Sequence, residues 1–388
     1  MHRLKILTFM IWWAAVGSMA QDSLRIRLDS LLADPMFETS QVGLMVYDLT
    51  ADSALYCHGE RQLLRPASTM KLVTAITALD KLGGSYYYST RVYYTGRVCD
   101  SLLVGDIYCV GGFDPMLTTA DVRALAESIS QMGIDSISGT LWFDRTMKEP
   151  LDYGEGWCWD DDNPLLTALS VGRKDVFAEQ FCRALQEQGI KLGGLRTAEG
   201  RLPAKGVRLL GTASHSINQV LQRMMKESDN FFAESMFYQT AAATGNRPAK
   251  AADARTLTRR LISRLGLGGQ PYKIADGSGL SLYNYVSAEL LVRLLRYASQ
   301  QPGIYDHLLP ALPIAGMDGT LKKRMTNGPA CGNVRAKTGT LTGISSLAGY
   351  CEAANGHQLC FAIINQGVMR NADGRAFQDR VCTVLCQP

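Results

Sequence analysis

The stretch RPASTMKLVTAITALDKLGG, residues 65–84, constrains the fold of this 388-residue chain more than any other. Between Met70 and Leu82 apolar residues recur so densely that the spacing predicts a helix buried on most sides. Pro66 suits the start of such a helix, and the two glycines that close the stretch suit its end. The segment therefore predicts a core helix that begins close to residue 70.

A serine and a lysine stand three residues apart at the start of this helix. Residues three apart share a helix face, so Ser68 Oγ and Lys71 Nζ can meet. An N-cap serine followed by a lysine that reaches out of a core helix would give the same letters. The rest of the chain has to decide between the two interpretations.

The N-terminus, MHRLKILTFMIWWAAVGSMA, has the pattern of a secretory signal peptide over residues 1–20. Arg3 and Lys5 precede an apolar run, and a small-x-small cleavage pattern ends at Ala20, so Gln21 is the expected mature start. An uncleaved anchor is the alternative, although the run is short for a spanning helix. We expect a periplasmic or otherwise extracytoplasmic protein with at most peripheral membrane contact.

Charge and cysteine content narrow the function classes. Loss of the two basic residues of the signal peptide lowers the formal charge from +4 to +2, which gives no case for nucleic-acid binding. Ten cysteines in an exported chain permit disulfides, and Cys99 with Cys109 and Cys351 with Cys360 flank strand-turn-strand patterns. These cysteines fit small buried hydrophobes equally well. No CxxC or His-bearing cluster indicates a metal site.

The pattern of helices and strands predicts an α/β (α+β) protein in which one domain interrupts another. Residues 86–110 are rich in Tyr, Val and Thr, which favour strands and hairpins, whereas the chain after about residue 206 is mainly helical until a last set of strands. We expect the first and last parts to pair into one sheet covered by helices. The predicted division is a domain of residues 21–83 and 206–388, with a strand-rich insertion over 84–205.

A nucleophilic serine needs a base. Histidine is poorly supported here, because no G-x-S-x-G elbow accompanies the four histidines of the mature part. Lysine can serve if a desolvated, electropositive site lowers its pKa. Such a site needs further positive charge near Lys71.

Two later motifs complete the pattern, and the second of them contains a further lysine, Lys337. KESDNFFAESMF contains Ser228-Asp229-Asn230 at the start of a predicted helix, where an N-cap serine is the structural alternative. NVRAKTGTLTG contains Lys337-Thr338-Gly339-Thr340 in a strand pattern, where glycine lets a substrate backbone approach. Ser-x-x-Lys, Ser-x-Asn and Lys-Thr-Gly, in this order, are the signatures of penicillin-binding proteins and serine β-lactamases.

Further phrases resemble the D-alanyl-D-alanine carboxypeptidase/endopeptidase family, the class C low-molecular-mass penicillin-binding proteins. They are VGGFDPML, GWCWDDD, DGSGLSLYNYVS and LPIAGMDGTLKKRM, and the resemblance covers nearly the whole mature chain. It implies a transpeptidase-like domain, as in penicillin-binding proteins and serine β-lactamases, with an insertion between Ser68 and Ser228. These two residues are 160 positions apart, far more than β-lactamases use.

Two departures from the family stand out. Family members usually carry a third glycine where this chain has Phe113, so contacts at GGFDP differ. Longer members carry a further all-β insertion after the tryptophan-rich loop, which this chain lacks.

The resemblance implies a serine D-Ala-D-Ala carboxypeptidase and DD-endopeptidase that acts on peptidoglycan stem peptides and is inhibited covalently by β-lactams. Ser68 is the implied nucleophile, Lys71 its base, Ser228 the proton carrier and Asn230 a partner of Lys71 and of the substrate amide. The implied substrate-binding residues are Lys337, Thr338, Gly339, Thr340 and Asp144, the last as a partner of the diamino-acid side chain. No metal or cofactor is required.

Two rival functions remain open. A β-lactamase needs a deacylating base between the second and third motifs, and the glutamates there, Glu234 and Glu289, lie outside the Glu-x-x-Leu-Asn pattern of the common type. A non-catalytic wall-binding sibling would usually have lost the serine or the lysine, and both are present.

Overall fold

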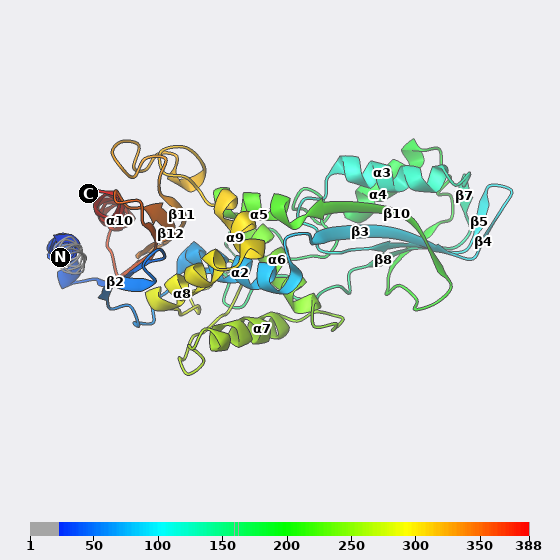
Figure 1. Cartoon of the computed structure of the whole chain (residues 1–388). Helices are drawn as coiled ribbons and strands as arrows, with labels where there is room; N and C mark the ends of the chain where they lie inside the picture. The colour runs from blue at the N-terminus through cyan, green and yellow to red at the C-terminus, as the bar shows by residue number, and fades with distance from the viewer. Residues whose placement is uncertain (1–22, 159, 162, 388) are drawn as a thin grey trace, which may run out of the picture.

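The computed structural model describes residues 23–158, 160–161 and 163–387, so the predicted signal peptide lies outside the described residues. Two sheets lie at opposite ends of an elongated molecule, with a group of helices between them (Figure 1). Both ends of the described chain lie beside the first sheet. No helix in the described part of the chain combines the length and the hydropathy needed to cross a membrane.

The first sheet joins the two ends of the sequence. It has the order β11-β12-β13-β1-β2 and is antiparallel throughout. Its strands are β1 (Gln41–Asp48), β2 (Ser53–His58), β11 (Arg335–Leu341), β12 (Ile344–Glu352) and β13 (Gln358–Gln366). Because β1 pairs with β13, the expectation that the first and last parts of the chain share a sheet is confirmed.

Helices cover both faces of this sheet. One face packs against α8 (Ala288–Ser299), which α2 (Met70–Leu82) contacts in turn, and the other against α10 (Asn371–Cys386) and the helical residues 23–32. All but the last residue of β12 are buried, as expected for a strand covered on both sides.

The helices of the central group are α2, α5 (Ile217–Lys226), α6 (Asn230–Ala242), α7 (Ala251–Arg264), α8 and α9 (Pro302–Ala311). α6 is buried along almost its whole length, which explains why its sequence has apolar residues on every side.

The second sheet has the order β10-β3-β6-β8-β9. Its strands are β3 (Tyr87–Thr95), β6 (Ile107–Val110), β8 (Thr140–Asp144), β9 (Arg196–Glu199) and β10 (Val207–Ser216), and α3 (Thr119–Ser130) and α4 (Phe177–Glu187) pack on it. Burial alternates along β3, so only one face of that strand contributes to the core. A small sheet of β4 (Arg97–Cys99), β5 (Leu102–Val104) and β7 (Ser136–Ile137) extends its far end (Figure 1).

The second sheet has a hydrophobic core of its own, separate from the two cores that flank the first sheet. The fold is therefore the predicted mixed α/β fold with an extra sheet. The proposed domain boundaries stay a prediction, and β10, which pairs with β3, begins just after the predicted end of the insertion at residue 205.

The two interpretations of Cys351 and Cys360 that the sequence left open are a disulfide and two buried thiols, and the structure favours the buried thiols. Cys360 lies opposite Tyr350 in the β12–β13 pair, so Cys351 and Cys360 point to opposite faces of the sheet. Cys360 packs toward the central helices and Cys351 toward α10. Cys99 and Cys109 lie on strands of different sheets, and all ten cysteines, each within the described residues, are free thiols.

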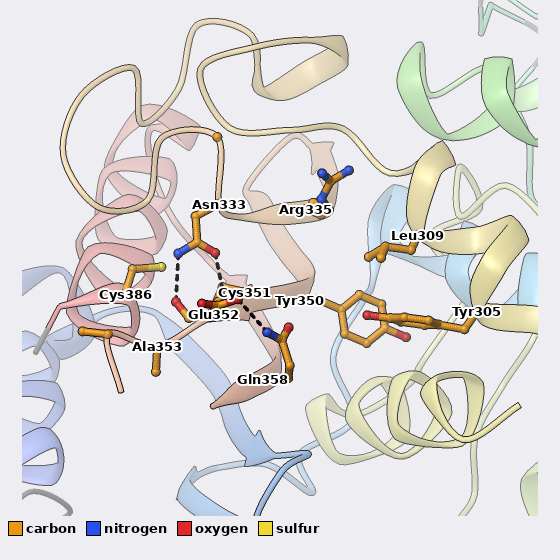
Figure 2. A pocket seen from close by; sticks show the side chains of 12 residues that line it. Tyr305, Leu309, Asn333, Arg335, Tyr350, Cys351, Glu352, Ala353, Gln358 and Cys386 are labelled. Carbon is orange, nitrogen blue, oxygen red and sulfur yellow. Dashed lines mark hydrogen bonds between the residues drawn. The ribbon is translucent and has the colours of Figure 1, made fainter. Parts of the chain in front are cut away.

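A pocket of about 450 Å³ lies at the end of β12 that is remote from the Lys-Thr-Gly motif (Figure 2). Tyr305, Arg335, Tyr350 and Cys386 are among its lining residues. Asn333 and Gln358 both donate hydrogen bonds to Glu352 there, so these three polar residues of the pocket are paired with one another.

Candidate active site

The sequence motif of Ser68 and Lys71 lies where a short 3-10 helix, η2 (Ala67–Thr69), runs directly into α2. Ser68 is half-buried, whereas Lys71 is completely buried. The N-cap residue of α2 is Thr69, so the N-cap interpretation of Ser68 is wrong. Ala67 has a φ of 46°, a strained value for a residue with a side chain, and such strain is often found at functional sites.

Lys71 Nζ donates hydrogen bonds to three oxygen atoms. They are Ser68 Oγ at 2.9 Å, Asn230 Oδ1 at 2.7 Å and the backbone oxygen of Ser278 at 2.8 Å. The amine is therefore held beside the serine hydroxyl from two further directions.

Burial lowers the pKa of Lys71 to about 8, although the carboxylates of Asp276, Glu234 and Asp229 oppose this shift. With that pKa, about one amine in ten is neutral at pH 7, whereas an ordinary lysine would be neutral in about one molecule in 3,000. Lys71 is thus able to accept a proton from Ser68 at neutral pH.

Ser228 and Asn230 lie where α5 is connected to α6. Asp229 caps α6 by accepting a hydrogen bond from Phe231 N, so the N-cap interpretation of Ser228 is also wrong. Ser228 adopts a left-handed φ of 61°, which is uncommon for serine. Its hydroxyl accepts a hydrogen bond of 2.8 Å from Lys337 Nζ.

Lys337 is the second fully buried lysine of the site. Burial, together with the nearby charge of Lys71, holds the pKa of Lys337 well below its usual range. Its amine also donates to the backbone oxygen of Thr338, and Thr338 Oγ1 donates to Thr320 Oγ1 at 2.7 Å. Thr340 is exposed next to these residues on β11.

Gly339 allows β11 to lie directly against the start of the catalytic helix. A Cβ at this position would lie 2.1 Å from Ser346 Oγ, 2.8 Å from the backbone oxygen of Pro66 and 3.0 Å from Ser68 N. Only glycine fits such an approach, which brings the Lys-Thr-Gly strand into contact with the backbone of Ser68.

Asp144 is not part of this group. Its buried carboxylate accepts hydrogen bonds from Thr146, from Leu202 N and from Arg247, whose guanidinium lies 2.6 Å away. Burial raises the pKa of Asp144, but the hydrogen bonds and the charge of Arg247 outweigh burial, and the net shift is downward. The predicted contact of Asp144 with a substrate stays a prediction.

Sequence reasoning missed several residues of this group. Ser278 acts through its backbone oxygen, which has no side-chain signal, and Asp276 lies in the same DGSG phrase. Asn163 contacts the site from the tryptophan-rich segment, where its Oδ1 accepts a hydrogen bond of 3.1 Å from Asn230. The phrases that resemble the family contain or adjoin all three, but they assign no role to them.

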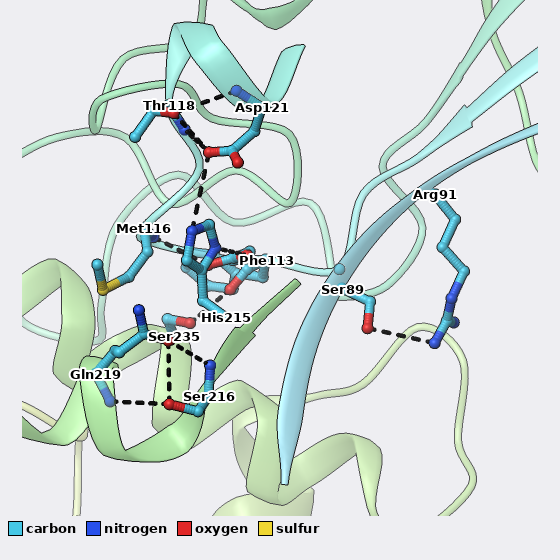
Figure 3. Close-up of polar contacts among 12 residues, drawn as sticks. Ser89, Arg91, Phe113, Met116, Thr118, Asp121, His215, Ser216, Gln219 and Ser235 are labelled. Atoms are coloured by element: carbon cyan, nitrogen blue, oxygen red, sulfur yellow. Dashed lines mark hydrogen bonds and ion pairs between the residues drawn. The ribbon is translucent and has the colours of Figure 1, made fainter. Parts of the chain in front are cut away.

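The loop that contains Phe113 runs from β6 to α3 and lies against Ser235 of α6 (Figure 3). Phe113 is fully buried at a left-handed φ of 52° and packs against Phe231 and Tyr238. Its backbone oxygen accepts a hydrogen bond from Ser235 Oγ, and its N–H donates to Ala168. The aromatic ring that replaces the family's glycine therefore fills space against the helix that carries Asn230.

Three histidines have polar partners remote from Ser68. His215 pairs with Asp114 at 2.7 Å, His307 with Asn218 and His357 with Asp48. This distribution agrees with lysine, rather than histidine, as the base next to Ser68.

Comparison with known proteins gives a consistent result across the chain. A D-alanyl-D-alanine carboxypeptidase from Actinomadura is 28% identical over 460 aligned positions that cover 94% of this chain and 84% of the relative. A carboxypeptidase from Mycobacterium tuberculosis is 30% identical, with 83% of this chain and 75% of the relative covered. The 460 positions exceed the length of this chain, so the Actinomadura protein has insertions relative to it.

Solved structures share the fold. Penicillin-binding protein 4 from Haemophilus influenzae superposes with a TM-score of 0.83 at 23% identity, over 92% of this chain and 97% of that one. It has also been solved in complex with a β-lactam. A predatory peptidoglycan endopeptidase from Bdellovibrio bacteriovorus has a TM-score of 0.60 at 16% identity, with coverage of 89% and 92%, and a related structure of it is acylated by penicillin G.

The sequence profile of one family matches residues 24–168 and 163–387, almost the whole described chain. The resemblance inferred from the motifs is therefore confirmed, and the chain belongs to the D-Ala-D-Ala carboxypeptidase 3 (S13) family.

Proposed function

We propose that this protein is an exported serine carboxypeptidase and endopeptidase that cleaves peptidoglycan stem peptides after a D-alanine, through an acyl-enzyme on Ser68. The observation that carries the proposal is the hydrogen bond of 2.9 Å between Ser68 Oγ and Lys71 Nζ, whose pKa is lowered to about 8. Membership of the S13 family supports the substrate class, and the pattern of a signal peptide over residues 1–20 supports a location outside the cytoplasm.

In the acylation step Ser68 Oγ attacks the D-alanine carbonyl while Lys71 takes the hydroxyl proton. Ser228 then relays this proton from Lys71 to the nitrogen of the leaving D-alanine or cross-linking peptide, so an ester forms as the amide bond breaks and Lys71 is neutral again. Proton transfer by a placed base contributes about 10²–10⁴-fold to such a rate. Water then attacks the ester and releases the shortened peptide.

Residues of β11 bind the negative charge of the substrate. The buried Lys337, with Thr338 and Thr340, binds the terminal carboxylate, and a bound anion raises the pKa of Lys337 back toward its usual range. The N–H groups of Ser68 and Thr340 stabilise the oxyanion, where one donor contributes about 10²–10³-fold. Gly339 supports this arrangement because it holds Thr340 close to Ser68.

A β-lactam resembles the D-alanine terminus and acylates the same serine. We expect the penicilloyl ester to persist for minutes or longer, because neither glutamate between the second and third motifs is placed as a deacylating base. Glu234 is buried, accepts N–H bonds from Gly277 and Ser278, and has a pKa raised to about 8. Glu289 is buried beside Arg61, at 3.3 Å.

Intact-protein mass spectrometry with benzylpenicillin tests the acyl-enzyme. A single adduct is expected on wild-type protein and none on Ser68→Ala. Ser299→Ala, a serine whose hydroxyl donates to its own helix at Arg296, is the matched control and should keep the adduct. A penicillin adduct on Ser68→Ala would show that Ser68 is not the acylated residue.

The peptidase step needs a separate measurement. Purified stem pentapeptides and cross-linked dimers are digested in parallel and followed by chromatography, with Ser68→Ala as the blank. Loss of D-alanine from the monomer and cleavage of the dimer are both expected. Acylation by penicillin without cleavage of either peptide would leave a penicillin-binding protein that lacks the proposed peptidase activity.

A further inference from the structure

The third acceptor of the Lys71 amine belongs to the loop of residues 276–281. The backbone oxygen of Ser278 lies 2.8 Å from Lys71 Nζ, and Thr74 Oγ1 on α2 donates to the backbone oxygen of Gly277. Gly279 lies so close to η2 that a Cβ there would be 1.9 Å from the backbone oxygen of Ala67. The loop is therefore packed directly against the segment that carries Ser68 and Lys71.

One side chain organises this loop. Asp276 is 1% exposed, and its carboxylate accepts five hydrogen bonds. Four donors come from the loop and its continuation: Ser278 Oγ, Gly279 N, Ser281 N and Asn284 Nδ2, at 2.7–3.2 Å. A carboxylate has room for these donors because it only accepts, and no neutral side chain of the same size can accept all five.

The fifth donor comes from outside the catalytic segments. Trp157 Nε1 donates to Asp276 Oδ2 at 2.8 Å. The same tryptophan-rich segment contacts the site again through Asn163, which accepts from Asn230. Both contacts are to groups that hold Lys71, since Asn230 Oδ1 and the loop of Asp276 supply two of its three acceptors.

We propose that Asp276 is a positioning residue of the reaction: it fixes the Ser278 carbonyl on Lys71 Nζ, and the docking of Trp157 on its carboxylate couples the tryptophan-rich segment to the catalytic base. This inference rests on the proposed function of Ser68 and Lys71. It adds a role for an acidic residue that does not touch the substrate.

The charges around Lys71 predict how the pH dependence of acylation changes when Asp276 is replaced. The carboxylates of Asp276, Glu234 and Asp229 all favour the ammonium form, with Asp276 the strongest of the three, and Lys337 lies on the other side. Burial and the charge of Asp276 raise the pKa of Glu234 to about 8, so in the wild type Glu234 keeps its proton near neutral pH. Loss of the Asp276 charge lowers the pKa of Glu234 as well, but Asp276 acts on Lys71 more strongly than Glu234 does. Removal of the Asp276 charge therefore lowers the pKa of Lys71.

The test compares Asp276→Asn with two other variants in full-length protein. Trp157→Phe keeps an aromatic ring but removes the N–H donor. Asp48→Asn is the matched control, because Asp48 is also a buried carboxylate that accepts backbone N–H bonds in a turn, from Thr50 and Ala51. The rate constant of Ser68 acylation by benzylpenicillin is measured across pH, per labelled active site, beside the melting temperature.

We expect acylation of Asp276→Asn to be about 10- to 100-fold slower, less than the loss of the base itself, because supporting groups of a site have effects of this order. The pH at which the acylation rate of this variant levels off (the pH inflection) should be lower than in the wild type. Trp157→Phe should slow acylation without moving the inflection, since no charge changes. Asp48→Asn should lower the melting temperature and leave both the rate per site and the inflection as in wild type.

A wild-type rate and inflection in folded Asp276→Asn would overturn the inference while Ser68 acylation stands. If Asp276→Asn does not fold, the acylation rate of Trp157→Phe is the deciding measurement. A wild-type rate in Trp157→Phe would overturn the proposed coupling between the tryptophan-rich segment and Lys71. Absence of an adduct on wild-type Ser68 would instead refute the proposed function, and this inference with it.

Discussion

Ser228 and Lys337 are 109 residues apart in the sequence, yet Ser228 Oγ accepts a hydrogen bond of 2.8 Å from Lys337 Nζ. This pair faces a second serine–lysine pair, Ser68 and Lys71, joined at 2.9 Å. Each lysine is completely buried, and the charge of Lys71 contributes to the lowered pKa of Lys337. The site therefore holds two buried amines, and a negative charge bound beside them is stabilised. A substrate that ends in a carboxylate supplies such a charge.

Lys337→Gln should weaken recognition of the terminal carboxylate. A hydrogen bond to a charged group contributes about 1.5–3 kcal/mol, so kcat/KM for a stem pentapeptide should fall about 10- to 150-fold. Acylation by penicillin, which also carries a carboxylate, should fall in parallel. Equal kcat/KM values for the variant and wild type would show that Lys337 does not bind that group.

Lys71→Arg should be far more damaging. Arginine keeps the positive charge but does not deprotonate, so the variant lacks a base and acylation should fall by about 10²–10⁴-fold. Lys148→Arg is the matched control, because Lys148 is another buried lysine with a pKa lowered to about 8 and donates to three backbone oxygens. The control should lose stability rather than acylation rate per folded molecule. Comparable acylation of Lys71→Arg and wild type would make Lys71 structural.

The pH dependence of acylation should follow Lys71. Since the base must be neutral and its pKa is lowered to about 8, the rate should rise about tenfold per pH unit below that value and level off above it. The measurement is the acylation rate constant from about pH 6 to about pH 10, the range over which the fraction of neutral amine changes. A flat profile through pH 8 would point to a different base.

The sequence predicts the parts of this fold whose patterns are local. The helix expected between Met70 and Leu82 is found as Met70–Leu82, because dense apolar spacing and clear ends mark it. α9 was missed, since Pro310 lies inside it and proline normally ends a helix. β10 was missed as well, because its VRLLGTASHS sequence lacks a clear alternation and the chain after about residue 206 was expected to be mainly helical.

The residues of the site also divide into those that the sequence predicts and those that it does not. Ser68 and Lys71 are detectable because helix geometry brings residues three apart together, and the motif order associates Ser228, Asn230 and Lys337 with them. The Ser278 oxygen and Asn163 are not detectable, because a backbone acceptor has no residue-type signal and a contact between distant loops depends on tertiary packing. Asp276 could be noticed only as a part of the DGSG phrase.

Asp144 provides the last prediction, which separates a structural role from the substrate contact expected from the sequence. Its side chain has no exposed surface, and Arg247 lies 2.6 Å from it. Removal of one partner of such a pair should lower the free energy of unfolding by about 2–3 kcal/mol in Asp144→Asn, less than for a fully buried pair because Arg247 is partly exposed.

The pH dependence of that loss has a definite sign. The pKa of Asp144 is lowered in the folded protein, so its contribution to stability is present above the ordinary carboxyl value of 3.8 and is lost as the pH falls through the folded value. The difference in unfolding free energy between wild type and Asp144→Asn should therefore be largest near neutral pH and shrink under acid conditions. Denaturant unfolding of both proteins measures it, and Arg247→Gln should show a loss of the same sign. If Asp144→Asn is as stable as wild type and as readily acylated by penicillin, but cleaves stem peptides more slowly, Asp144 binds the ammonium group of the diamino acid and the structural role is wrong.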